Sequence, residues 1–355
     1  MPERTGPQYD YSHGLHVDRT VRRGGHVIQH AIHLPAAELA LPQSDARREV
    51  YERVDALVAD PQIEKTRSGH AIEFVVLNQD SPDNGLEVVH LEWHTAVRDP
   101  GVRPLLAALA LSGRRRMVVS SFGMGQASPL PRRIAQEMAR SGSFVPAAEH
   151  LASAYQRVIG DYDRLVLSGT SEGARRAIGL AAIFEHVHSL FSHDGPGSRQ
   201  MEHGWIGTGR AFLSEQEHNK AYTAAAQDPE LQTAQRAQDG LRRFGRSVLR
   251  QLAIGNVINL TVREPAAMGH PMLGTDVATA LPHIHHRVAF SVPEFSRLNN
   301  PGDVLAMADH VGTLAGEDGP EIVTLAFPGS HSSGAANMPV VARLYDLAQE
   351  AEPTL

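Results

Sequence analysis

A single serine between two glycines, where a strand pattern changes to a helix pattern, limits what this chain can fold into. Residues 165–181 read LVLSGTSEGARRAIGLA. Apolar β-forming residues lead into Gly169, Ser171 lies at the centre of G-x-S-x-G, and small and apolar residues follow at helical spacing. The pattern predicts a buried strand that turns sharply into a helix, with the serine hydroxyl raised clear of the sheet.

Strand and helix patterns alternate on both sides of this serine. We expect strands at 26–34, 70–78, 86–93, 116–122, 164–169, 187–195, 287–295 and 321–327, and helices at 45–58, 102–113, 146–160, 171–185, 304–317 and 338–351. Strands that alternate with helices imply right-handed crossovers and a mostly parallel sheet. The sequence therefore predicts an α/β protein.

The alternation also divides the chain into regions. Residues 1–25 are polar and aperiodic and are expected to form a flexible lead-in. The regular pattern covers 26–197 and 283–355, which are assigned to one α/β core. It stops between 198 and 282, where helical runs with Met-Gly turns predict an inserted helical cap.

Composition excludes several classes of function. The chain of 355 residues has no cysteine, so disulfides, thiolate zinc sites and a cysteine nucleophile are excluded. Its formal net charge is -7 and its basic residues are scattered, which argues against a nucleic-acid surface. No apolar stretch resembles a signal peptide or a membrane span, so a cytoplasmic protein without a membrane partner is expected.

The bracketed serine is the candidate nucleophile. Side chains at Gly169 and Gly173 would collide with the neighbouring strand and helix, and the helix that follows directs free N–H groups toward the reaction site. The backbone N–H of Glu172 is then one oxyanion donor. An ordinary turn is the alternative, and the flanking strand and helix favour the nucleophile.

A serine needs a base, and the base needs a carboxylate. His331, in a Gly/Ser-rich loop after the last strand, is the candidate base, against the alternative of an ordinary loop histidine. Glu294, at the end of the strand before it, is the first choice of acid. Asp194, after the strand that follows the elbow, is the second, and Asp303 is the third because it is expected to begin a helix.

These features together resemble the α/β-hydrolase superfamily over about 86–351. The stretch from Glu87 to Ala110 is similar to its third strand, oxyanion loop and first helix, and the sequence after 116 to its fourth strand. Gly123, Gly125 and Ser128 are similar to the G-x-G-x-x-S stretch that follows that strand. LVLSGTSEGARRAIGLAA resembles the nucleophile elbow, and AFPGSHSSGAANMPVVARLYDLA the histidine loop and last helix.

The resemblance implies an eight-stranded, mostly parallel sheet with helices on both faces and a mobile helical cap over the site. It implies hydrolysis through an acyl-enzyme, with Ser171 as nucleophile and His331 as base. Where the family often has His-Gly, this chain has Glu92-Trp93-His94, so the second oxyanion donor is assigned to the backbone N–H of Trp93 or His94.

Other conspicuous residues are weighed against simpler roles. His186, His188 and the run HIHH at 283–286 could hold a metal, but no H-E-x-x-H motif or completing carboxylate is present. No metal and no cofactor are therefore expected. Trp93 and Trp205 are candidates for lining an apolar pocket, with packing in a core as the alternative.

The sequence thus favours a serine hydrolase that cleaves a small or medium ester or thioester. The expected partner is a small-molecule substrate with an apolar acyl or alcohol part, and a homo-oligomer is compatible with the sequence. A carbon–carbon bond hydrolase with the same triad is one alternative. A non-catalytic protein of the same fold that binds a ligand or partner is the other.

Overall fold

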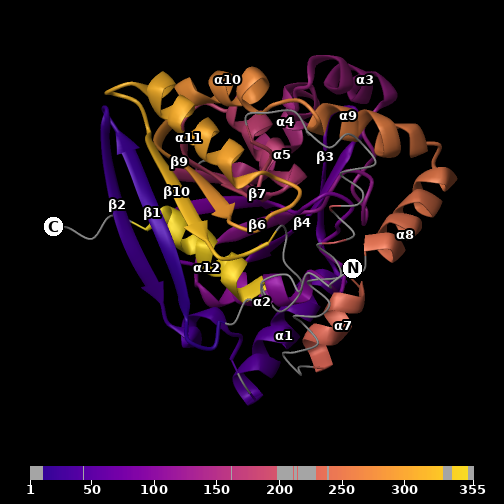
Figure 1. Cartoon of the computed structure of the whole chain (residues 1–355). Coiled ribbons are helices and arrows are strands. Elements are labelled where there is room, and N and C mark those ends of the chain that lie inside the picture. Colours follow the sequence, from indigo (N-terminus) through magenta and orange to yellow (C-terminus); the bar gives the residue numbers. More distant parts are fainter. Residues whose placement is uncertain are drawn as a thin grey trace, which may run out of the picture.

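Ten strands form one sheet in the computed structural model of this chain (Figure 1). The structure describes residues 11–42, 44–160, 162–197, 211, 214, 229–237, 240–330 and 338–350. The strands are β1 (Leu15–Arg23), β2 (His26–Leu34), β3 (Gln62–Lys65), β4 (Ala71–Leu77), β5 (Gly85–His90), β6 (Arg116–Val119), β7 (Arg164–Thr170), β8 (Val187–His193), β9 (Ile284–Pro293) and β10 (Glu321–Phe327).

The strand order is β2-β1-β10-β9-β8-β7-β5-β6-β4-β3. The strands from β10 to β6 are parallel to one another, so their carboxyl ends meet at one edge of the sheet. Antiparallel strands extend both sides: β4 and β3 beyond β6, and β1 and β2 beyond β10. The predicted α/β class and mainly parallel sheet are confirmed.

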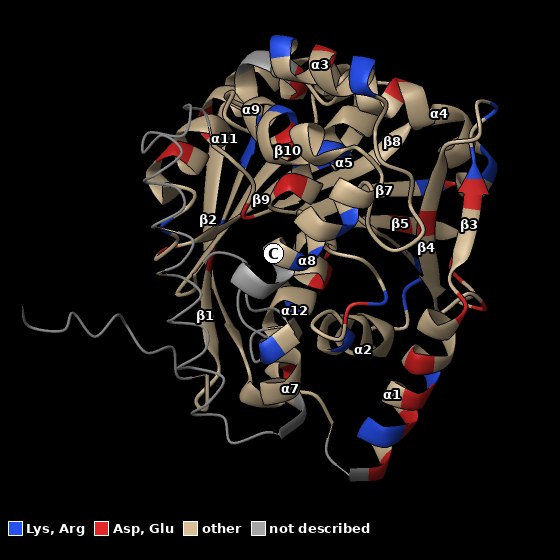
Figure 2. Cartoon of the chain, turned by 90° about the vertical axis from the view of Figure 1, so that its right-hand side faces the viewer, with Lys and Arg blue, Asp and Glu red and all other residues tan. Residues whose placement is uncertain are grey.

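Helices cover both faces of the sheet (Figure 1). The face with α3 (Arg132–Ser141), α4 (Val145–Ile159), α5 (Glu172–Ala181) and α11 (Pro301–Ala315) encloses one apolar core. The opposite face, with α1 (Ser44–Ala59), α2 (Arg103–Leu111) and α12 (Met338–Gln349), encloses the other. On the outer helices such as α1, acidic and basic residues are interspersed (Figure 2).

Two strands were not predicted, so the expected eight-stranded sheet has ten. Residues 15–23 were assigned to the flexible lead-in, but they form β1, with Leu15, Val17 and Val21 buried on alternate positions. Gly24 and Gly25, both with positive φ, turn the chain into β2, and the hairpin adds to the sheet beside β10. The other addition is β3, a four-residue strand that pairs with β4.

The segment between β8 and β9 is helical where the structure describes it. It contains α7 (Pro229–Ala237), α8 (Gly240–Ala253), π-helical turns at Asn259–Arg263 and Leu273–Val277, α9 (Glu264–Met268), α10 (Ala278–Ala280) and the 3-10 turn Leu281–His283. Gln251 of α8 donates to the carbonyl of Gly123, 2.8 Å away, just beyond the carboxyl end of β6. Within the described ranges, no helix combines the length and the apolar character that a bilayer crossing requires.

A buried arginine joins the sheet to α12 near the amino end of β6. Arg116, fully buried, donates from Nε to Oε2 of Glu87 at 2.6 Å and from a terminal nitrogen to Oδ1 of Asp346 at 2.6 Å. It also donates to the carbonyl of Leu109 at 3.0 Å. The cation is therefore enclosed by acceptors from a neighbouring strand and two helices.

Replacement of Arg116 is expected to lower the free energy of unfolding much more than replacement of a surface arginine. Arg116→Met leaves the Glu87 carboxylate buried without its cation, which should lower the free energy of unfolding by about 3–5 kcal/mol. The control Arg48→Met removes exposed ion pairs on α1 and should cost less than about 1 kcal/mol. Urea unfolding of both variants measures the difference. Equal losses would contradict this account of Arg116.

Candidate active site

Ser171 lies on a strained turn between β7 and α5. Its backbone has φ of 55° and ψ of -119°, in a region that side-chain-bearing residues rarely adopt. Its N–H donates to the carbonyl of His193 at the end of β8, 3.0 Å away. Ser171 is partly exposed, whereas every residue of α5 after it is buried. The turn therefore raises the serine at the carboxyl edge of the sheet.

The two flanking glycines are required by close backbone contacts. A Cβ on Gly169 would lie 2.2 Å from the carbonyl oxygen of Gly173, and a Cβ on Gly173 would lie 2.3 Å from that of His90. Backbone atoms cannot move away as the end of a flexible side chain can. Side chains at these two positions would therefore collide, as expected, and their absence lets the start of α5 lie against the end of β5.

This packing places the loop that follows β5, which carries the candidate oxyanion donors Trp93 and His94, beside the start of α5. Glu172 is the first residue of α5, and N–H groups in a first helical turn lack intrahelical acceptors. β5 ends at His90, three residues earlier than expected, so Glu92, Trp93 and His94 form the loop that follows it. Because Gly173 contacts the carbonyls of His90 and Leu91, this loop begins beside the first turn of α5.

The loop itself is held by several contacts. His94 has a positive φ of 60°, and its ring lies against the Trp93 indole with centroids 3.8 Å apart. The carbonyl of Thr95 accepts from the N–H of Ser121 at 2.8 Å, which ties the loop to the segment after β6. Trp93 is half-buried and donates from Nε1 to Oε2 of Glu264, 3.0 Å away on α9.

A buried ion pair lies directly behind the serine. The Arg176 guanidinium donates from Nε to Oε2 of Glu172 at 3.0 Å, to the carbonyl of Ser120 at 3.0 Å, and to the carbonyl of Leu91. Burial raises the pKa of Glu172, and the Arg176 cation opposes that rise. One arginine thus joins the elbow helix to the segments that leave β5 and β6.

Sequence reasoning missed Arg176 and Glu264. A signal for Arg176 was present, because two consecutive arginines in a helix expected at the centre of the fold need buried acceptors. Glu264 carried no comparable signal, since it lies 171 positions from Trp93.

The three candidate acids have very different surroundings. Asp194 is fully buried, directly after His193, with φ of 44°. Its N–H donates to Oγ of Ser291 at 3.1 Å, and Asn299 donates to its carbonyl at 2.6 Å and to its Oδ1 at 3.3 Å. Glu294 is exposed, and its N–H donates to the carbonyl of Phe327. Asp303 lies in the first turn of α11, as expected.

The candidate base His331 and the candidate pocket residue Trp205 lie outside the described residues. The chain leading to His331 is described as far as Ser330, which is buried. The carbonyl of Gly329 accepts from the N–H of Phe295 at 3.0 Å.

The loop similar to the G-x-G-x-x-S stretch closes on itself. Gly123 and Gly125 have positive φ, and a Cβ on Gly125 would meet the carboxyl group of Glu73. Ser128 donates its N–H to the carbonyl of Ala71 and accepts from the Ala71 N–H at 3.0 Å through its hydroxyl. These contacts give the loop a structural role beside β4.

The clustered histidines lie near the amino ends of β8 and β9, away from Ser171. The rings of His186 and His285 are 5.5 Å apart, and those of His188 and His286 are 4.6 Å apart. Burial and neighbouring positive groups lower the pKa of His188 to about 4. In the part of the chain that the structure describes, no group of three metal-ligating side chains is present.

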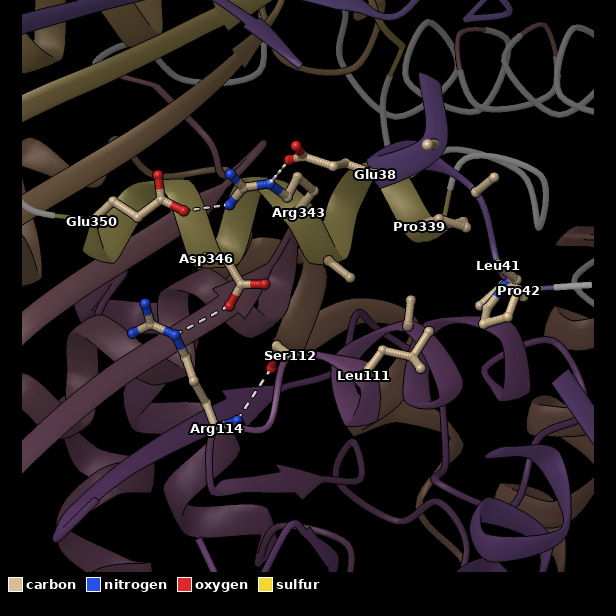
Figure 3. Close-up of a pocket in the computed structure, with 14 residues that line it drawn as sticks. Glu38, Leu41, Pro42, Leu111, Ser112, Arg114, Pro339, Arg343, Asp346 and Glu350 are labelled. Atoms are coloured by element: carbon tan, nitrogen blue, oxygen red, sulfur yellow. Dashed lines mark hydrogen bonds and ion pairs between the residues drawn. The ribbon is translucent and has the colours of Figure 1, made fainter. Parts of the chain in front are cut away.

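A cavity of about 770 Å³ lies elsewhere, between the 3-10 turn Ala36–Leu39, α2 and α12 (Figure 3). Leu41, Leu111 and Pro339 line its apolar part. Its charged groups are paired: Arg114 with Asp346 at 3.3 Å, and Arg343 with Glu38 at 3.0 Å and with Glu350. The elbow contributes no residue to it.

The elbow glycines provide a test of the geometry that does not depend on activity. Gly173→Ala places a methyl group against the His90 carbonyl, so the free energy of unfolding should fall by about 1–3 kcal/mol or more. The control Gly245→Ala, in α8, meets no atom within 4 Å and should be neutral or stabilising by about 0.5–1 kcal/mol. Urea midpoints measure both effects. An unchanged midpoint in Gly173→Ala would show that α5 does not approach β5 this closely.

Comparison with known proteins identifies the fold. No protein-family model and no curated protein matches the chain. A solved structure of a membrane phospholipase A, described as a bacterial virulence factor, matches with a TM-score of 0.52 and 17% identity. The match covers 85% of this chain and 87% of that one.

A second solved structure, of E-2-(acetamidomethylene)succinate hydrolase, matches with a TM-score of 0.50 and 14% identity over 82% of this chain and 99% of that one. At these low identities the likeness shows the fold alone. Together with the parallel sheet, its helices on both faces and the elbow after β7, it shows that the chain has the α/β-hydrolase fold.

Proposed function

We propose that this protein is a serine hydrolase that cleaves a small or medium ester or thioester through an acyl-enzyme. The observation that carries the proposal is the backbone of Ser171, strained at φ 55° on a turn that two glycines permit. Strain of this kind is costly and concentrates at functional sites. The names of the two solved structures, a phospholipase and a hydrolase, favour hydrolysis.

In the proposed reaction, Oγ of Ser171 attacks the acyl carbon while His331 takes the hydroxyl proton. The N–H of Glu172 and an N–H of the loop at Trp93 or His94 stabilise the oxyanion. His331 then passes the proton to the departing alcohol or thiol, and the acyl group stays on Ser171. Water, deprotonated by His331, releases the acid and restores the serine.

Asp194 is the acid that we assign to this reaction, in place of the first choice, Glu294. A triad acid is effective when it is buried and held by hydrogen bonds, because its charge then stabilises the imidazolium with little screening. Asp194 is buried and held by Asn299, and it follows the residue whose carbonyl binds the Ser171 N–H. Glu294 is exposed to solvent.

We also propose that residues 198–282 act as a cap over the site. Two contacts support this: Gln251 reaches the Gly123 carbonyl beyond β6, and Glu264 binds the Trp93 indole beside the elbow. A cap that rests on the carboxyl edge can exclude water and supply apolar surface to the substrate.

The nucleophile is tested with a fluorophosphonate probe. The wild-type protein should be labelled, and Ser171→Ala should lose both labelling and turnover of a p-nitrophenyl ester. Ser141→Ala, which removes a surface hydroxyl on α3, is the control and should label normally. A folded wild-type protein that neither labels nor turns over a panel of such esters would favour a non-catalytic binding protein.

The acid is tested by separate amide substitutions. Asp194→Asn should lower kcat on the order of 10⁴-fold, the loss seen when the acid of a serine triad becomes an amide. Glu294→Gln should stay within a few fold of wild type, because its carboxylate is exposed. Circular dichroism checks that both variants are folded. The reverse result would return the role to Glu294.

A further inference from the structure

The strongest unexplained contact joins the insertion to the loop beside the elbow. Glu264 begins α9 and is 1% exposed, although it carries a carboxyl group. Its Oε2 accepts the indole N–H of Trp93 at 3.0 Å. Among the residues that the structure describes, its Oε1 has no hydrogen-bond partner. A buried carboxyl group with one partner is costly, so its retention calls for a physical reason.

The charges around Glu264 do not balance if every group is ionised. Glu172 and Arg176, both on α5, are the charged groups that act on it. Arg176 already binds Glu172 and two main-chain carbonyls. Two buried carboxyl groups therefore share one cation, and repulsion favours a proton on one of them.

Other charged groups on the packed elements are engaged elsewhere. Arg263, next in sequence, donates to Asn259. Arg175 donates to the carbonyls of Gly142 and Met268 and interacts with Asp276. On α3, which packs against α9, the charged side chains of Arg132, Arg133, Glu137 and Arg140 are exposed.

We propose that Glu264 is a positioning residue that fixes the Trp93–His94 loop and thereby couples the cap to the oxyanion site. The inference rests on the proposed hydrolase function. The indole of Trp93 donates to the Glu264 carboxyl group and also contacts the ring of His94, so a fixed Trp93 fixes the backbone that would supply the second oxyanion donor. Donors for an oxyanion must be placed before the reaction, and small displacements of reacting geometry reduce rates strongly.

The coupling is expected to depend on pH. Burial, and then the Glu172 carboxylate, raise the pKa of Glu264 to about 8, while the Trp93 hydrogen bond and Arg176 act in the opposite direction. We call the arrangement in which Glu264 is buried against Trp93 the closed arrangement. A carboxyl group whose pKa is raised there stabilises that arrangement most strongly below its ordinary pKa, near 4.3. As the pH rises from there, the equilibrium constant that favours the closed arrangement over states in which Glu264 reaches water falls about tenfold per pH unit. The fall ends at about pH 8, and the constant does not change above it.

Three substitutions separate positioning from simple packing. Glu264→Leu keeps the volume but removes the acceptor, Glu264→Gln keeps an acceptor without titrating, and Glu137→Gln is a matched control at an exposed acid of α3. In a Trp205→Phe background, tryptophan emission comes from Trp93 alone, since the chain has two tryptophans. Emission wavelength and acrylamide quenching are followed from pH 6 to 9.5, and ester turnover is followed in the same range.

We expect the Leu substitution to expose Trp93 to the quencher and to lower kcat about 10- to 100-fold with KM little changed. The Gln substitution should recover most of that kcat at pH 6 and abolish the alkaline change in Trp93 emission. Glu137→Gln should behave as wild type. Unchanged quenching and kcat in a folded Leu variant would overturn the proposal.

Two further outcomes remain decisive. If the Leu variant does not fold, the Gln variant decides alone, because an alkaline emission change that persists in it contradicts the role of Glu264. If the wild-type protein hydrolyses no ester, the proposed function fails. The emission and quenching measurements then still show whether Glu264 holds Trp93, so the two failures are distinguishable.

Discussion

The close approach of the His90 carbonyl to Gly173, which leaves no room for a side chain at residue 173, is the constraint on which the rest of the candidate site depends. It brings the first turn of α5 directly against the end of β5. Without that approach, the guanidinium of Arg176, one turn further along α5, could not reach the carbonyls of Leu91 and Ser120. The strained Ser171, the loop after β5 and the segment after β6 are thus held by one close backbone contact and one cation.

Three ionisable side chains, those of Glu172, Arg176 and Glu264, are buried behind the elbow. Burial of ions is costly, and apolar residues of similar volume often stabilise a core better. Here the buried ionisable groups lie at the three segments whose relative positions would define an oxyanion site. Glu172 lies in the turn that carries the serine, and Glu264 binds Trp93 on the opposing loop. A polar network with few alternative pairings favours one arrangement of those segments, which is what such a site needs.

What could be predicted from the sequence was mostly what depends on nearby residues. The elbow was predicted because a strand, two glycines and a helix all fall within 165–181. The hairpin strand β1 was missed although Leu15, Val17 and Val21 alternate, because a charged residue, Arg19, stands at a position where the alternation predicts an apolar one. Arg19 is nonetheless buried and donates to the carbonyl of Glu350, a partner 331 positions away that no local pattern reveals.

The choice of acid shows why the remainder needed tertiary structure. In sequence, Glu294 and Asp194 both follow a strand that ends at the carboxyl edge, so the two are equivalent there. The two residues differ in which neighbouring strand their own strand end contacts. β9 ends beside β10, and the chain after it continues along that strand, with Glu294 bonded to Phe327 and Phe295 to Gly329. β8 ends beside β7, where the His193 carbonyl binds the Ser171 N–H. Strand order, which is a property of the whole sheet, therefore places Asp194 next to the elbow and directs Glu294 toward solvent.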